Sequence, residues 1–180
     1  MSIGLSVICT VLSWFIITGI ENRPFLPSLT DGRAIPVQIL LGSLYGSVAG
    51  LICLFLLLAA PVFEDLRNLF IGIINDVNLN PVTIILISAL AGFSEEFLFR
   101  GGLQPLIGLW WSSALFIALH GYFNPRNWRI TLYGLLMFAL SIGLGLMYQW
   151  VGLLAAIFAH TMVDVVILLG LLVNQKYYLK

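Results

Sequence analysis

Residues 82–100 read VTIILISALAGFSEEFLFR, a long apolar run that ends in two adjacent carboxylates and an arginine. A bilayer core is about 30 Å thick, so a helix rising 1.5 Å per residue needs about 20 apolar residues to cross it. Working outward from this run, we find windows of this kind at Ile3–Ile20, Val37–Ala60, Val82–Leu103, Leu106–His120, Ile130–Trp150 and Val151–Val173. The pattern predicts an all-α, polytopic transmembrane helix bundle of about six spans.

The composition supports a membrane protein. Of the 180 residues, 61% are hydrophobic and 9% are charged, whereas soluble domains contain about 25% charged residues. The net charge is zero and no basic run or zinc-finger spacing occurs, which argues against nucleic acid as a partner. We expect one transmembrane domain over residues 1–180 with a catalytic core at about 82–173, and the lipid bilayer as its surroundings.

Several aromatic and small residues lie where membrane helices use them. Rings such as Tyr122 fall near the window edges, where tyrosine and tryptophan anchor at headgroup depth. Gly42, Gly46 and Gly50 recur every four residues in the second window, so another helix is expected to pack closely there. The polar connection Glu64–Asn80 carries apolar residues at helical spacing, which predicts either a short interfacial helix or a plain amphipathic linker.

The basic residues favour one orientation. With a cytoplasmic N-terminus, more basic residues fall on that side than on the other, which favours both termini in the cytoplasm of a multi-pass protein in the cell membrane. The cytoplasmic set is Arg67, Arg126, Arg129, Lys176 and Lys180, and the opposite set is Arg23 and Arg33.

Four charged residues lie inside the windows. Each unpaired charge at the bilayer centre costs about 3 kcal/mol, so Glu95, Glu96, Arg100 and Asp164 should face one another or a wet cavity. At about 100° per residue, Arg100 lies about 40° from Glu96 but about 140° from Glu95. We therefore expect Arg100 to neutralise Glu96, which leaves Glu95 as a candidate general base.

The only two histidines, His120 and His160, also lie inside windows. A single membrane histidine can simply bond a neighbouring helix. His160 and Asp164, however, share one helical face at a spacing of four, and an imidazole oriented by a carboxylate recurs in catalysis. Phe116 precedes His120 by four residues and is expected to hold its rotamer.

Taken in order, Glu95-Glu96-x-x-x-Arg100, Phe116-x-x-x-His120 and His160-x-x-x-Asp164 resemble the motifs of the CPBP family. This family contains the CAAX prenyl endopeptidases and bacteriocin-processing or immunity proteins, is also called the Abi family, and is related to the Rce-type CAAX proteases. The resemblance covers Glu95 to Asp164 and implies an intramembrane endopeptidase. Its substrate would be a peptide or membrane protein, with a prenylated chain and a bacteriocin precursor as the options.

The resemblance also implies roles for these residues. Glu95 and His120 would activate a water, and His160 and Asp164 would stabilise the tetrahedral oxyanion. Glu96, Arg100 and Phe116 would support the site. Many members have asparagine at the last motif position, so Asp164 is a departure that leaves orienting His160 or ligating a metal as alternatives.

Cofactor use stays open at this level. Glu95, His120 and His160 could ligate Zn²⁺ with one open position, yet the signature His-Glu-x-x-His is absent. A metal-free mechanism is an equal alternative. Two further functions remain, a proton- or cation-coupled transporter and a non-catalytic bacteriocin-immunity-type membrane protein.

Overall fold

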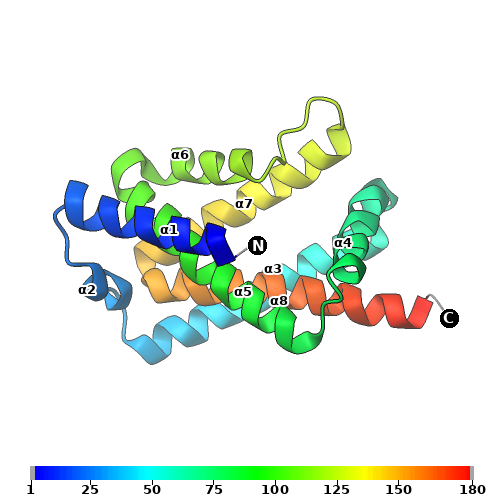
Figure 1. The fold of residues 1–180 in the computed structure, drawn as a ribbon, viewed down its shortest axis with the longest axis horizontal. Helices are drawn as coiled ribbons and strands as arrows, with labels where there is room; N and C mark the ends of the chain where they lie inside the picture. The colour runs from blue at the N-terminus through cyan, green and yellow to red at the C-terminus, as the bar shows by residue number, and fades with distance from the viewer. Residues whose placement is uncertain (1–2, 179–180) are drawn as a thin grey trace.

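The computed structural model describes residues 3–178, and their backbone is almost entirely helical. No strand occurs in this part of the chain, and only an isolated bridge joins Gly32 to Gly152. The prediction of an all-α polytopic bundle is thereby confirmed. The elements, seen in Figure 1, are α1 Ile3–Phe15, η1 Ile16–Ile20, α2 Phe25–Thr30, α3 Ile35–Ala59, η2 Pro61–Phe63, α4 Glu64–Asp76, α5 Pro81–Glu96, η3 Phe97–Leu103, α6 Gln104–Leu119, α7 Trp128–Trp150 and α8 Leu153–Tyr178.

Five helical runs among the described residues are long and apolar enough to cross a membrane, against about six predicted windows. The difference lies in Pro81–Leu119, which joins the third and fourth windows in one run of 39 residues. A straight helix of this length would measure about 60 Å, roughly twice a bilayer core. Instead, the backbone leaves helical geometry at Gly108, where φ is 81°, and α5 and α6 run in opposite directions in Figure 1.

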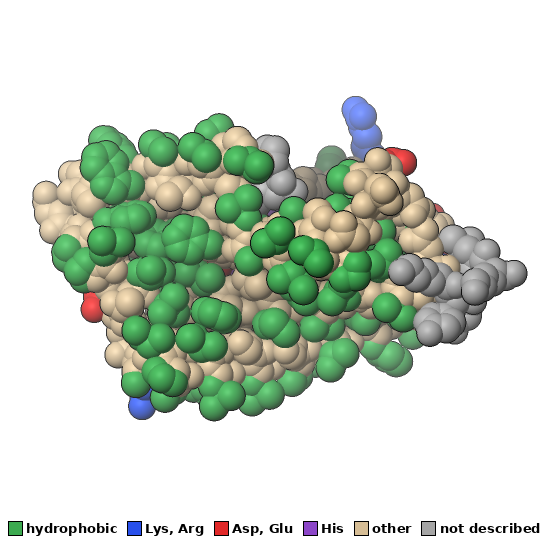
Figure 2. Space-filling view, turned by 60° about the horizontal axis from the view of Figure 1, so that its bottom comes forward, with side chains coloured by type: hydrophobic (Ala, Val, Ile, Leu, Met, Phe, Trp, Pro, Cys, Tyr) green, Lys and Arg blue, Asp and Glu red, His purple; other side chains and the backbone are tan. Residues whose placement is uncertain are grey.

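The surface of the molecule is apolar over most of its length. Figure 2 shows hydrophobic side chains covering the middle of the visible face, while its charged side chains gather toward the two ends of the long axis. Large side chains such as Phe55 and Trp110 are 68% and 64% exposed. Apolar patches of this extent require a non-aqueous environment, so the chain is a multi-pass membrane protein.

The segment between α3 and α5 contains a helix, α4, at Glu64–Asp76; its place at the membrane interface stays a prediction. Its apolar residues Leu66 and Ile74 are buried. Asp65 forms an ion pair of 3.0 Å with Arg129 at the start of α7. α4 thus packs across one end of the bundle, at the right in Figure 1.

The glycine face of α3 packs against α8. A Cβ atom at Gly42, Gly46 or Gly50 would meet the backbone of Ala155, Ala159 or Val163, respectively. This confirms the predicted packing role and shows its consequence, because His160 follows Ala159 directly. The close approach of α3 therefore sets the position of His160 within the bundle.

Gly46→Ala should lower the thermal unfolding midpoint in detergent. The added Cβ would lie 2.8 Å from the carbonyl carbon of Ala159, and overpacking of this kind costs about 1–3 kcal/mol. Gly72→Ala is the matched control, since no atom lies within 4 Å of a Cβ at Gly72. Equal midpoints for the two variants would show that the contact of α3 with α8 is not tight.

Candidate active site

The last turn of α5 carries Glu95 and Glu96. The helix begins at Pro81, a favoured first position, and the side chain of Asn80 caps it by accepting a hydrogen bond of 3.0 Å from the backbone N–H of Thr83. A π-helical segment, η3, follows the two carboxylates at once. Such segments are frequent at functional sites.

Glu96 forms a completely buried ion pair with Arg100. Nε of Arg100 donates to Oε2 of Glu96 over 3.0 Å, and both side chains are fully shielded from solvent. A second nitrogen of Arg100 donates to the backbone oxygen and hydroxyl of Ser141 on α7, at 3.0 and 2.8 Å. The pairing predicted from the spacing is confirmed, and it ties α5 to α7.

The other oxygen of Glu96 holds His160. Nδ1 of His160 donates to Oε1 of Glu96 over 2.8 Å, which leaves Nε2 facing the cavity. Asp164 does not occupy the orienting position suggested by its spacing, because its Oδ2 lies 3.6 Å from Nε2 instead. The orienting carboxylate is thus Glu96, which lies 64 residues away in the chain and could not be recognised from local spacing.

His120 lies at the end of α6 and is held in a similar way. Its Nδ1 donates to the carbonyl oxygen of Phe116 over 2.7 Å. The ring packs on the side chain of Phe116, with centroids 4.3 Å apart, and stacks on Tyr122 at 6.0 Å. The expected contact between Phe116 and the imidazole is confirmed, and Nε2 of His120 is left facing Glu95.

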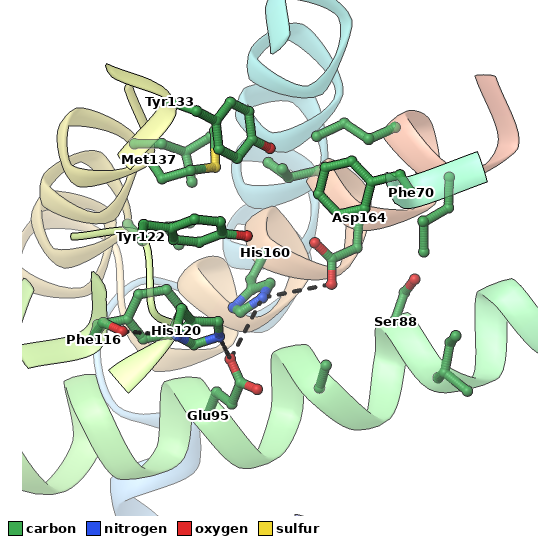
Figure 3. A pocket seen from close by; sticks show the side chains of 17 residues that line it. Phe70, Ser88, Glu95, Phe116, His120, Tyr122, Tyr133, Met137, His160 and Asp164 are labelled. Carbon is green, nitrogen blue, oxygen red and sulfur yellow. Dashed lines mark hydrogen bonds and ion pairs between the residues drawn. The ribbon is translucent and has the colours of Figure 1, made fainter. Parts of the chain in front are cut away.

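Glu95 lies between the two imidazoles. Its Oε2 is 3.5 Å from Nε2 of His120 and 4.0 Å from Nε2 of His160, and the residue is only 7% exposed. Figure 3 shows the three side chains turned toward one another from α5, α6 and α8. Three ionisable groups far apart in the sequence therefore converge on one point.

A cavity of about 300 Å³ opens beside this point, at the small end of ligand pockets. Glu95, His120, His160 and Asp164 all line it. Its other walls are mostly apolar and come from α4, α5, α6, α7, α8 and the α6–α7 loop. These residues are Phe70, Ile87, Ser88, Ala91, Phe116, Tyr122, Tyr133, Met137, Leu140, Leu144, Val163, Ile167 and Leu168.

Tyr122 is a site residue that the sequence did not identify. Expected as an interfacial anchor, it lies in the cavity wall with its ring on His120. Burial, together with the negative charges of Asp164 and Glu95, raises the pKa of Tyr122 to about 12. Its phenol is therefore neutral at physiological pH. The only available signal was its position two residues after His120.

The described residues include no group of three or more His, Cys, Asp or Glu side chains arranged to hold a metal ion. Glu95, His120 and His160, the ligands that a zinc ion would use if one bound, do not form such a group as they stand. In each imidazole Nδ1 is hydrogen-bonded and Nε2 faces a carboxylate oxygen across the cavity wall. This orientation suits a water molecule as well as a metal.

Comparisons with known proteins found one relative and one family. The chain is 44% identical over 84 residues to the uncharacterized protein YpbD of Bacillus subtilis (strain 168), a match covering 46% of this chain and 42% of that relative. No solved structure matches the chain. The family model for type II CAAX prenyl endopeptidase Rce1-like proteins matches residues 77–166, which is half of the chain and includes every motif residue named above. The chain therefore belongs to the Rce1-like family of type II CAAX prenyl endopeptidases.

Proposed function

We propose that this protein is an intramembrane endopeptidase in which Glu95 and His120 activate a water molecule. The observation that carries the proposal is the convergence of Glu95, His120 and His160 on one small, largely apolar cavity within the bundle. The family supports peptide hydrolysis as the reaction class. The catalytic core is the region at about 82–173.

The proposed water molecule contacts Glu95 and His120 from the cavity side. With Nδ1–H of His120 donated to the Phe116 carbonyl, the neutral ring has an acceptor at Nε2, 3.5 Å from the acceptor Oε2 of Glu95. One water can donate its two hydrogens to these two atoms. Its oxygen lone pair is then directed into the cavity, toward a substrate carbonyl carbon.

The reaction then proceeds without any additional reagent. The water oxygen forms a bond to the carbonyl carbon as Glu95 takes a proton. The tetrahedral intermediate collapses with cleavage of the C–N bond, and Glu95 returns the proton to the leaving nitrogen. A carboxylate that acts first as base and then as acid is restored at the end of each turnover.

His160 is the proposed donor to the oxyanion. Because its Nδ1–H is directed to Glu96, Nε2 carries a hydrogen only in the imidazolium form. Carboxylate oxygens of Glu96, Asp164 and Glu95 lie 2.8, 3.6 and 4.0 Å from the ring nitrogens and stabilise that cation. A donor held in place before the reaction stabilises the developing negative charge at little cost in reorganisation.

Asp164 is not suited to act as the second hydrogen-bond donor to the oxyanion, the role that the family motif would assign to this position. An ionised carboxylate has no hydrogen to donate. At 3.6 Å from Nε2 of His160, it acts instead as a counter-charge to the imidazolium. The location proposed for the enzyme is the cell membrane with both termini cytoplasmic, and its substrate is a peptide or membrane protein, such as a prenylated chain or a bacteriocin precursor.

The purified protein should cleave apolar peptides in detergent, where no ion gradient exists. We expect the rate to be unchanged by a strong chelator, because the proposed base is a carboxylate and the water is held by side chains alone. Mass spectrometry of the products locates the cleaved bond. A rate abolished by chelator and restored by Zn²⁺ would contradict the metal-free mechanism.

Two other outcomes would favour a different function. Gradient-dependent uptake into proteoliposomes without any peptide cleavage would indicate a transporter. Absence of both activities, with immunity conferred on a sensitive strain, would indicate a non-catalytic immunity protein.

A further inference from the structure

One side of the cavity has no substrate-binding role in the proposed reaction. Glu95, His120 and His160 account for one end, while Asp164, Ser88 and the hydroxyl of Tyr122 lie farther along the wall. An apolar cavity in a membrane protein has no need of these polar groups for packing, and polar groups are costly there. Their presence indicates that they bind part of the substrate.

Asp164 provides an accessible negative charge. Its side chain is 34% exposed, and its only ion-pair partner among the described residues is the His160 ring. No Lys or Arg occurs among the described residues that line the cavity. Arg100 is fully buried, and its bonds go to Glu96 and Ser141. The cavity therefore presents the carboxylates of Asp164 and Glu95 with no side-chain cation other than the imidazoles.

Ser88 independently indicates that a ligand binds on this side of the cavity. It is 1% exposed, lines the cavity, and its hydroxyl has no hydrogen-bond partner among the residues that the structure describes. A buried hydroxyl without a partner costs about 1–3 kcal/mol. In Figure 3 the hydroxyls of Ser88 and Tyr122 are turned toward the space around the Asp164 carboxylate. A ligand bound there would satisfy Ser88.

We propose that Asp164, Ser88 and Tyr122 form a subsite that selects a peptide with a cationic side chain, lysine or arginine, beside the scissile bond. The subsite rests on the proposed endopeptidase function. A carboxylate neutralises the ammonium or guanidinium, and the two hydroxyl oxygens accept its remaining hydrogens. The apolar walls accommodate the methylene groups of the same side chain.

The same charges disfavour anionic substrates. An acidic side chain in the subsite would face Asp164 and Glu95, and the imidazoles are the only cationic groups among the described residues that line the cavity. Like charges in a site of low polarity repel strongly. The subsite thus disfavours an acidic side chain beside the scissile bond.

The test uses one apolar peptide that the purified full-length protein cleaves. Each position flanking the cleaved bond is changed in turn to Lys, Arg, Met or Glu, with free and acetylated N-termini. We expect kcat/KM at one position to be at least tenfold higher for Lys or Arg than for Met, and lowest for Glu. Acetylation should not alter this ratio, since the cation belongs to a side chain.

Substitutions in the subsite identify the residues that produce the preference for Lys or Arg. Asp164→Asn should bring the Lys/Met ratio close to one, whereas Asp164→Glu should retain a preference for Lys. Ser88→Ala should reduce the ratio, while Ser113→Ala should not. Ser113 is the matched control because its hydroxyl is equally buried and without a partner among the described residues, but it does not line the cavity.

The possible outcomes distinguish failure of the subsite proposal from failure of the proposed endopeptidase function. Cleavage with equal kcat/KM for Lys, Met and Glu at every position would overturn the subsite and leave the endopeptidase standing. A preference for Lys that survives in Asp164→Asn would do the same, as would a preference abolished by acetylation. Failure of the wild-type protein to cleave any peptide would overturn the endopeptidase and the subsite together.

Discussion

Replacement of Glu95 by glutamine is expected to lower kcat for peptide cleavage by about 10²–10⁴-fold, the contribution usual for a general base. The amide has nearly the same shape as the carboxylate but cannot accept a proton from water. Glu95 is 7% exposed and lies within 4.0 Å of both imidazoles, so no other carboxylate has equal access to the water between Glu95 and His120. The Glu96 carboxylate is occupied by Arg100 and His160.

The measurement is the single-turnover rate on a cleavable peptide in detergent, with the unfolding midpoint recorded beside it. Glu64→Gln is the control, because Glu64 lies at the start of α4 with 59% of its side chain exposed and is outside the cavity. It should retain the wild-type rate. Undiminished cleavage by the folded Glu95→Gln protein would exclude Glu95 as the base.

Arg100→Leu should produce the largest loss of stability, about 3–5 kcal/mol, because it leaves a buried charge without its partner. Glu96 is 0% exposed and would retain only His160. The contact from Arg100 to Ser141 on α7 would also be lost. Since Glu96 holds Nδ1 of His160, we expect cleavage to fall even in the fraction that remains folded.

Arg129→Leu is the matched control for Arg100→Leu, because it also removes an arginine from an ion pair. Arg129 also forms a 3.0 Å bond to a carboxylate, Asp65, but the two side chains are 44% and 62% exposed, and exposed pairs contribute about 0–1 kcal/mol. The double variant Glu96→Gln/Arg100→Leu should recover part of the stability while its cleavage stays low. Equal losses of stability in Arg100→Leu and Arg129→Leu would contradict the buried ion pair.

Periodicity and spacing predicted the features that are local in the chain. The apolar windows predicted the helices. A spacing of four residues predicted the ion pair of Arg100 with Glu96 and the contact of Phe116 with His120. The windows placed a break between Leu103 and Leu106, whereas the backbone leaves helical geometry at Gly108. Spacing could not locate it, because glycine adopts helical and left-handed conformations with similar ease and only its surroundings decide between them.

What the sequence determined by itself is the membrane environment, the helical class and the set of ionisable residues that must find partners inside the bundle. These follow from hydropathy and from the 3.6-residue period, which depend only on neighbouring residues. What only the tertiary structure decided is which groups meet. Glu96, not Asp164, orients His160, and Tyr122 and Ser88 turn toward Asp164, because contacts between helices depend on the rotation and close packing of whole helices, such as the approach of α3 to α8 along the glycine face.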